Sequence, residues 1–506
     1  MTRRGLGLAV LGVWLAVVGW HVKREYFVPE ATRLAMGARS LAPGAHWFVI
    51  RLDGATIGVA QSALDTLPDG FRFRDEITLD VPAMGRLHRS YARTDIELGA
   101  VLELRTFRFA LDSEIGRFAV EGVAYGDTAV SVVMDAGGGA QPSFLRTDQG
   151  LLLDAVLPLR MAASGALRVG NEFTTRVFDP SSMAEREVSV HVVARETLVV
   201  PDSAALVDGR WVATVLDTVP VWRVDQKFGG VSVSSWVDDD GQIVRAESPL
   251  GFTIERLYYD LAQQEWRTGR DRRDLAAGYG ALIEGTAIAS NVDLGDVLLR
   301  DSLAVRLRGV ELDGFDLAGD RQALRGDVLT VMRQRSPADA GYTLPYRGGG
   351  APGEELEATA LVQSTDPRII DTARRIVGDE TDPVVVARLL NAWVYRELAK
   401  EITLSVPSAV QVLEAGQGDC NEHTVLYLAL ARAVGLPART AVGLVHIRGS
   451  FYYHAWPEVW LGEWVAVDPT LGQYPADASH LRFLTGGLAR QVELVRLIGR
   501  LQLEVL

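Results

Sequence analysis

The chain has 506 residues, of which 48% are hydrophobic and 23% charged, and its formal net charge is −14. At roughly 100–200 residues per domain, this length predicts two to four globular domains. The acidic balance, without any block of basic residues, argues against nucleic acid as a partner. The single cysteine, Cys420, excludes an intramolecular disulfide, so any cysteine chemistry must use that residue.

The N-terminus has the pattern of a membrane anchor. An apolar run from Gly5 to Trp20 follows Arg3 and Arg4, and further basic residues come after it. As a helix this run would span about 24 Å, short for a hydrocarbon core of about 30 Å but extendable by its flanking side chains. A cleaved signal peptide is the alternative, although no small-x-small cleavage site precedes the charged flank. We expect residues 1–25 to be an uncleaved transmembrane helix, with the bulk of the chain extracytoplasmic, in the periplasm or cell envelope.

Residues 42–265 are predicted to form a large domain of antiparallel β-sheet. Apolar and polar side chains alternate along short segments that are separated by turn residues, which is typical of strands with one buried face. Asp53-Gly54 marks one hairpin turn and Asp238–Gly241 another. The second turn is acidic, but its spacing differs from that of an EF-hand calcium loop. No combination of residues in this domain predicts a catalytic site.

The rest of the chain changes character twice. A further alternating stretch predicts a smaller β unit at residues 275–346. From residue 355 the period becomes helical, and Asp366-Pro367 and Asp382-Pro383 each place a capping residue before a proline, a typical helix start. We therefore expect an α+β domain at 355–485, with helices packed on an antiparallel sheet, and a C-terminal helical tail at 486–506.

Cys420 is predicted to begin a buried helix. Asp419 is a suitable N-cap, the run from Asn421 to Val434 is apolar almost all round, and Gly435 and Pro437 end it. The first turn of a helix points free amides and a partial positive charge at its side chains. This position therefore predicts a lowered thiol pKa and donors for an oxyanion. A buried structural cysteine is the alternative that the residue alone leaves open.

A histidine and an aspartate follow on predicted strands. We predict three strands between residues 439 and 467, with His454 on the second and Asp468 at the end of the third. An imidazole near a thiol can take its proton, and a carboxylate behind the ring can fix the tautomer. The pattern predicts a catalytic triad of Cys420 as nucleophile, His454 as base and Asp468 as the orienting acid.

Three segments carry a family resemblance: "GDCNEHTVLYLALARAVGLPART", "YYHAWPEVW" and "EWVAVDPT". Together they resemble the transglutaminase-like superfamily of papain-fold cysteine enzymes, over about residues 355–480. The resemblance implies a papain-like fold and places the nucleophile, base and acid of the family on Cys420, His454 and Asp468. Animal members of the family are often calcium-dependent. This sequence has no matching calcium loop, so we expect no metal and no other cofactor.

Other polar and aromatic residues have weaker claims to a role. Gln417 could donate to an oxyanion, although a solvated loop glutamine is the simpler interpretation. His423 lies one turn after Cys420 and could act as a rival base, but no carboxylate is expected to orient it, so a supporting role is preferred. Trp456 fits both a cleft wall and core packing. His446 and His480 receive no functional assignment.

Two hypotheses of different classes follow. In the first, Cys420 attacks a carboxamide or peptide carbonyl of a protein or peptide substrate and forms a thioester. An amine acceptor would then give transglutamination, and water would give a protease or amidase. In the second, the chain is a membrane-tethered scaffold without catalysis, whose β domains bind a partner.

Overall fold

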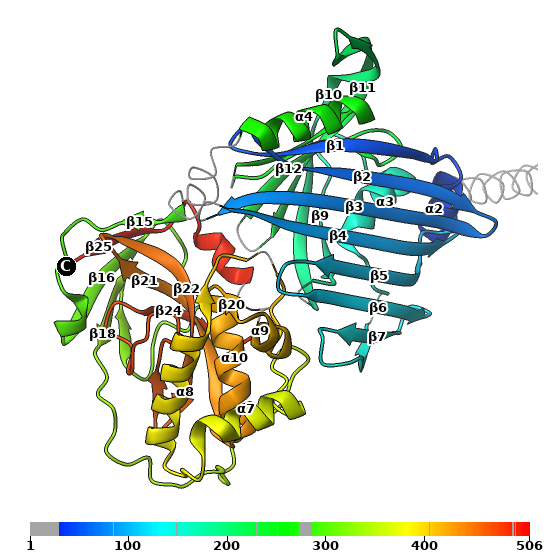
Figure 1. The fold of residues 1–506 in the computed structure, drawn as a ribbon. Helices are drawn as coiled ribbons and strands as arrows, with labels where there is room; N and C mark the ends of the chain where they lie inside the picture. Colours follow the sequence, from blue (N-terminus) through cyan, green and yellow to red (C-terminus); the bar gives the residue numbers. More distant parts are fainter. Residues whose placement is uncertain are drawn as a thin grey trace, which may run out of the picture.

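The computed structural model describes residues 30–506, apart from 84–85, 148–149, 182, 229–230, 250, 273–285, 404, 488–489 and 491. The chain folds into a large curved sheet followed by a domain of helices and smaller sheets, which lies beside it (Figure 1). The predicted membrane helix at residues 1–25 lies outside the described residues. In the part that is described, no helix is both long and apolar enough to cross a membrane.

The large sheet contains fourteen strands among the described residues, all paired antiparallel. In spatial order they are β8 (Gln141–Arg146), β7 (Ala129–Asp135), β6 (Arg117–Tyr125), β5 (Leu104–Asp112), β4 (Arg86–Gly99), β3 (Gly70–Ala83), β2 (Ala55–Leu67), β1 (Gly44–Leu52), β14 (Phe252–Leu257), β13 (Ile243–Glu247), β12 (Val231–Val237), β11 (Arg210–Phe228), β10 (Ala184–Val207) and β9 (Glu172–Asp179). Strands that are neighbours in sequence pair with each other, except β8 and β9, which lie at opposite edges of the sheet, and the β1–β14 pair joins the two runs. Asp53 and Gly54 turn between β1 and β2 with φ of 47° and 82°, which confirms the predicted hairpin.

The period of two in the sequence decides which face of the sheet is buried. Phe71 and Phe73 on β3 are 6% and 5% exposed, whereas Arg72 pairs with Glu97 on the outer face, and Arg74 with Asp95. The buried face packs against α2 (Glu30–Ala38) and α3 (Leu157–Ser164), which share its core. Apolar burial on this face therefore holds the sheet and its covering helices together.

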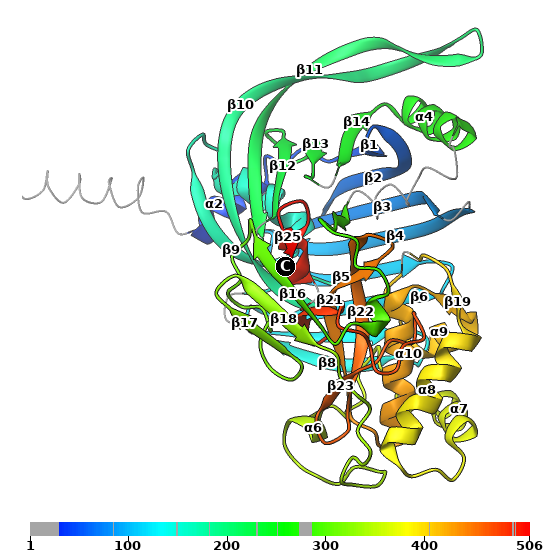
Figure 2. The ribbon, with the colours of Figure 1, turned by 90° about the vertical axis from the view of Figure 1, so that its left-hand side faces the viewer.

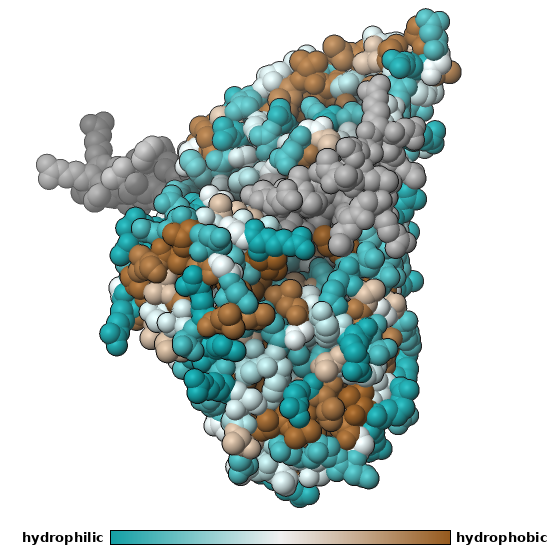
Figure 3. All heavy atoms as spheres, turned by 60° about the vertical axis from the view of Figure 1, so that its left-hand side comes forward, coloured by the Kyte–Doolittle hydropathy of each residue, from teal (hydrophilic) through white to brown (hydrophobic). Residues whose placement is uncertain are grey.

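The β10–β11 hairpin is much longer than its neighbours and extends beyond the rest of the sheet (Figure 2). Its far half carries exposed apolar side chains, among them Val199 (63% exposed), Leu206 (60%) and Leu216 (61%). In the space-filling view, apolar side chains gather along this upper part of the molecule (Figure 3). Beside this far half of the hairpin, α4 (Tyr259–Arg272) lies across β1 and β2. It is fixed by Glu265, which pairs with Arg51, and by Gln264, which bonds to the backbone of Trp211 on β11.

The C-terminal domain is built round α10 (Cys420–Ala433). Inside α10, Leu426, Tyr427 and Leu430 are completely buried. Its helical neighbours are α7 (Pro367–Val377), α8 (Pro383–Glu397) and α9 (Ala409–Ala415), and shorter elements are α6 (Ala351–Glu354), β19 (Ala399–Lys400) and β20 (Gln417–Gly418). The sheet against α10 has the order β15 (Ile288–Ala289), β22 (Ser450–Trp460), β21 (Ala438–Ile447) and β24 (Leu481–Thr485), with β23 (Trp464–Ala466) paired to β22. The expected α+β arrangement of helices on an antiparallel sheet is therefore present.

Two boundary predictions are wrong. The smaller β unit expected at 275–346 is not separate, because β16 (Ser302–Arg308), β17 (Gln322–Arg325) and β18 (Val328–Met332) share one core with β21, β22 and β24. A sheet this small buries only one face, and that face needs the neighbouring domain to cover it. The expected helical tail at 486–506 contains a 3₁₀ helix at Val492–Leu497 and then a strand, β25 (Gln502–Val505), paired with β16.

The β-sheet domain and the C-terminal domain meet at α9. Gln411 of α9 donates to the carbonyl of Arg117 at 2.6 Å, and Ser408, the N-cap of α9, donates to the carbonyl of Ala136. Gln363 donates to that same carbonyl at 3.1 Å. Since α9 lies only a few residues before Cys420, the ends of β6 and β7 help to position the segment that leads to α10.

The shared core predicts how a cavity in the small sheet will spread. Leu329 on β18 is completely buried, so Leu329→Ala should cost about 2–5 kcal/mol. If the core is continuous, amide hydrogen exchange measured by mass spectrometry will also rise in β21 and α10. The matched control is Leu299→Ala, because Leu299 is 74% exposed and its loss should change stability by less than about 0.5 kcal/mol. Faster exchange confined to β16–β18 would mean that the small sheet folds separately.

Candidate active site

The start of α10 is held by a capping box. The Asp419 side chain accepts from the Asn421 amide at 2.8 Å, and the Glu422 carboxylate accepts from the Asp419 amide at 2.9 Å. Glu422 is 1% exposed and also accepts from the hydroxyls of Thr403 and Ser405, both at 2.7 Å. These bonds satisfy the amides of Asp419 and Asn421, so the residue between them, Cys420, has a fixed place on the first turn.

Cys420 is partly exposed and packs against β22. The backbone amide of Ala455, the residue after His454, donates toward its sulfur. Burial nevertheless raises the pKa of the Cys420 thiol well above its ordinary value. The prediction of a lowered thiol pKa is therefore wrong for the thiol by itself, because desolvation of the anion outweighs the favourable amides at the helix start. A nucleophilic Cys420 needs a base to take its proton.

His454 and Asp468 meet as the sequence predicts. Their Nε2 and Oδ2 atoms are 2.8 Å apart, and Asp468 is completely buried. Oδ1 of Asp468 accepts from the amides of Thr470 and Leu471, at 2.7 and 2.9 Å, so the Asp-Pro-Thr turn fixes the carboxylate. Burial opposes ionisation, but His454 and a second imidazole hold the pKa of the Asp468 carboxyl well below its usual range.

The second imidazole belongs to His480, for which the sequence predicts no role. His480 is completely buried, and its Nε2 lies 3.0 Å from the same Oδ2 of Asp468. Its Nδ1 lies 3.1 Å from Oδ1 of Asp477. Burial opposes protonation, but these two carboxylates raise the pKa of His480 above its ordinary value. Nothing in the sequence marks this contact, since His480 comes after a loop whose path decides which side chain it meets.

The Trp456 ring packs against the imidazoles of both His454 and His480. Its ring stacks on His454, with ring centroids 6.1 Å apart and an angle of 22° between the ring planes, and meets His480 edge-on at 5.2 Å. Trp456 is completely buried. Of its two predicted roles, core packing is therefore correct, and this packing limits the tilt of the His454 ring.

The thiol and the imidazole of the predicted triad lie on facing elements. Within the described residues, Cys420 forms no hydrogen bond with His454; the polar neighbour of the sulfur is the Ala455 amide on the same strand. Asp468 occupies Nε2 of His454, which leaves Nδ1 as the ring nitrogen available to a thiol. The structure thus forms the His454–Asp468 half of the triad and brings the backbone of the His454 strand to the sulfur.

The rival base and the proposed oxyanion donor have other surroundings. His423 is completely buried, its Nδ1 lies 2.7 Å from the carbonyl of Asp419, and burial lowers its pKa. Among the described residues no carboxylate is hydrogen-bonded to the His423 ring, and its bond to the start of its own helix fits the supporting role that the sequence favours. Gln417 is half-buried on β20, which pairs with β19, and its oxyanion role remains a prediction.

His454, Asp468 and His480 place donor atoms within 4.8 Å of one another, close enough for a metal to be considered. The two Nε2 atoms both face Oδ2 at hydrogen-bond distances, and Oδ1 already accepts two amides. Metal ligands would instead direct lone pairs at a common empty point. The distances are those of a hydrogen-bonded network, and we assign it no metal.

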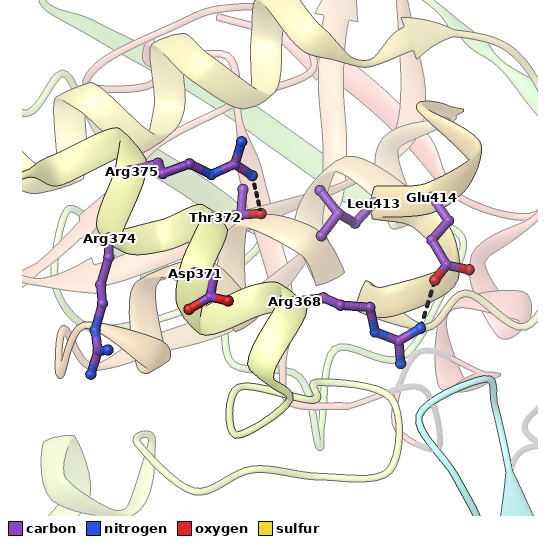
Figure 4. A pocket seen from close by; sticks show the side chains of 7 residues that line it. All are labelled: Arg368, Asp371, Thr372, Arg374, Arg375, Leu413 and Glu414. Atoms are coloured by element: carbon purple, nitrogen blue, oxygen red, sulfur yellow. Dashed lines mark hydrogen bonds and ion pairs between the residues drawn. The ribbon is translucent and has the colours of Figure 1, made fainter.

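Two hollows lie near the helices of this domain. A mostly apolar cavity of about 320 Å³ lies between α10 and the large sheet. Asn421, Thr424 and Val425 of α10 form part of its wall, and Asn421 is the next residue after Cys420 in the chain. The other, on the outer side of α7 and α9, is a shallow surface region lined by charged side chains (Figure 4). There Arg368 pairs with Glu414, and Arg375 with the hydroxyl of Thr372. Neither Cys420 nor His454 lines this outer hollow, so it is not the active site.

With this geometry in place, comparison with known proteins identifies the class of the domain. Residues 370–469 match the model of the transglutaminase-like superfamily, a range that includes Cys420, His454 and Asp468. The chain therefore carries a transglutaminase-like domain in its C-terminal half, as the sequence motifs predicted.

Individual relatives are distant. An uncharacterised protein of Haemophilus influenzae is 29% identical over 113 residues, which are 21% of this chain and 29% of that protein, so the match spans under a third of the relative. A provisionally named cysteine protease from Cytophaga hutchinsonii is 14% identical, with a TM-score of 0.28, over 40% of this chain and 83% of the other. A DUF1089 family protein from Pseudomonas aeruginosa is 13% identical, with a TM-score of 0.24, over 38% and 89%. Similarities this low do not define the whole fold.

The capping box predicts a stability effect at the nucleophile. Glu422→Ala removes the acceptor of three donors, so it should lower the free energy of unfolding by about 2 kcal/mol or more, whereas Glu422→Gln should lose less. Urea unfolding measures the loss, and hydrogen exchange should speed up first at the start of α10. Glu397→Ala is the control, because Glu397 is an exposed residue of α8. Equal stability of Glu422→Ala and Glu397→Ala would contradict the importance of the cap.

Proposed function

We propose that the C-terminal domain is a cysteine-dependent acyl-transfer enzyme that uses Cys420, His454 and Asp468. The observation that carries this proposal is the buried 2.8 Å contact between His454 and Asp468. His454 lies on β22, and the amide of the next residue on that strand, Ala455, faces the sulfur of Cys420. A carboxylate that fixes one ring nitrogen of a histidine leaves the other to exchange a proton with a nucleophile. The transglutaminase-like match over the same residues supports the proposal.

The chemistry follows from the raised pKa of the thiol. Nδ1 of His454 takes the Sγ proton as the sulfur forms a bond to the carbonyl carbon of an amide. The resulting imidazolium gives that proton to the amide nitrogen, the carbon–nitrogen bond breaks, and ammonia or an amine leaves a thioester on Cys420. His454 then deprotonates water or an amine, which attacks the thioester and releases the thiol. The acceptor decides between hydrolysis and amine transfer.

We propose peptide or protein carboxamides as the substrate class. Stabilisation of the oxyanion would come from amides at the start of α10 and from the Ala455 region of β22, with Gln417 as a further candidate donor. No step of this scheme needs a metal.

A scaffold without catalysis is the competing function, and one observation favours it. The Cys420 thiol has a raised pKa and forms no hydrogen bond with His454 within the described residues. A structural cysteine would have these properties. The two functions differ in whether His454 activates the thiol.

Thiol reactivity separates the two functions. In the enzyme, the rate of iodoacetamide alkylation of Cys420 at pH 6–7 should exceed that of free cysteine and should fall about tenfold or more in His454→Gln. His191→Gln should stay within about threefold of wild type, because His191 is an exposed histidine of β10, outside the C-terminal domain. Mass spectrometry of the single-cysteine chain gives the rates. A wild-type rate no higher than that of free cysteine would favour the scaffold.

Turnover separates hydrolysis from transfer. A glutamine-donor peptide and a labelled amine are incubated with wild type, with Cys420→Ala and with the control His191→Gln, which changes an exposed histidine of β10. Label that is incorporated by wild type and the control alone means transferase. Deamidated or cleaved peptide without label means hydrolase. If Cys420→Ala matches wild type in every product, the proposed chemistry fails for this substrate class.

A further inference from the structure

We propose that His480 is a doubly protonated positioning residue that holds Asp468 ionised and in place. His454 is then oriented by a chain of three further side chains, Asp468, His480 and Asp477. The inference rests on the proposed function, since it assigns His480 a role toward the base. It goes further by placing a second histidine and a second aspartate behind the triad.

The protonation of His480 follows from its two partners. One ring nitrogen lies 3.0 Å from Asp468 and the other 3.1 Å from Asp477, and in each case the facing atom is a carboxylate oxygen. A neutral imidazole carries only one N–H, so one of these contacts would set a lone pair against an anionic oxygen. With both nitrogens protonated, both contacts become charge-assisted hydrogen bonds.

Asp477 is itself fixed as an acceptor. Its Oδ1 accepts from the amide and the hydroxyl of Ser479, at 2.8 and 2.7 Å, and its Oδ2 accepts from Gln473 at 2.9 Å. Arg321 donates to the backbone carbonyl of His480 at 2.8 Å. His480 is thus held from both ends of its ring and through its backbone, which gives Asp468 a partner that cannot swing away.

The benefit to the reaction is electrostatic. Oδ2 of Asp468 accepts from His454 and His480 together, and the two rings lie 5.9 Å apart, centroid to centroid. An unshared buried carboxylate would stabilise a His454 imidazolium strongly and so slow the return of its proton to the leaving nitrogen. A fixed cation beside Asp468 offsets part of the attraction between Asp468 and the His454 imidazolium. The same cation favours the thiolate form of Cys420.

Several other ionisable groups surround this chain, and the variants of His480 and Asp477 leave them all unchanged. Near Asp477 they are Arg321 and His446. At the thiol end of the site they are Asp419, Glu422, His423 and Lys400. A difference in the pH dependence of Cys420 alkylation between these variants and wild type therefore reports the removal of the charges on His480 and Asp477.

The first test is the pH dependence of Cys420 alkylation by iodoacetamide in the full chain. His480→Gln keeps an N–H donor toward Asp468 but removes the positive charge. The pH midpoint of alkylation should therefore rise by about one unit, which is about a tenfold lower rate on the acidic side. His446→Gln is the matched control, because His446 is a buried histidine of the same domain whose ring faces Phe451, and its midpoint should equal that of wild type.

A double variant protects the test against misfolding. His480→Gln alone leaves the buried Asp477 without its cation, so we pair it with Asp477→Asn, which removes both charges. The lost cation is nearer to His454 than the lost anion, so the midpoint should lie between those of wild type and the single variant. A folded double variant with the wild-type midpoint would overturn the proposal.

A second readout does not depend on catalysis. In protein labelled with ¹⁵N-histidine, the NMR signals of the His480 ring nitrogens are assigned by their disappearance in His480→Gln. Their chemical shifts should show that both nitrogens are protonated at pH 7.5. A neutral His480 there overturns the inference, even if Cys420 is reactive. A cationic His480 beside a Cys420 that reacts no faster than free cysteine would support the network and reject the proposed enzyme.

Discussion

The C-terminal domain depends on one buried carboxylate. Asp468 has no exposed surface, yet it accepts four N–H groups: two backbone amides from its own turn and two imidazoles from different segments. A buried carboxylate without such partners would cost several kcal/mol or become neutral. The strand order around it, with β23 leading into the turn and β22 presenting His454, serves to bring these donors to one point. The helix that carries Cys420 packs against the same strands.

Local signals in the sequence were sufficient for much of this arrangement. Asp366, Asp382 and Asp419 cap the helices that they were predicted to cap, since an N-cap acts through amides two or three residues away. Hairpins and alternating strands follow the same logic, because a turn and a period of two are properties of a short segment. The His454–Asp468 contact could be predicted for another reason, because the motifs that contain these two residues resemble those of a known family.

The features that the sequence does not predict depend on contacts between distant segments. His480 meets Asp468 only through the course of an irregular loop, and no spacing announces that meeting. The small sheet merges with the C-terminal domain because β25, at the far end of the chain, pairs with β16. In the tail, Leu501, Leu503 and Val505 are buried in alternation, a short pattern that a helical interpretation of residues 486–506 overlooked. The thiol pKa was misjudged because desolvation depends on burial, which a helix position alone does not reveal.

The contacts at α9 give the large sheet an influence on the thiol that involves no residue of the reaction. The carbonyl of Ala136, at the end of β7, accepts from both Gln363 and Ser408, which places one peptide group of the sheet at the start of α9. A short connection then leads from α9 to Cys420. A change in curvature of the sheet at β6 and β7 would therefore be transmitted as a displacement of the nucleophile, in the way that a lever moves about its support. The long hairpin of β10 and β11 lies in the part of the sheet away from these contacts (Figure 2).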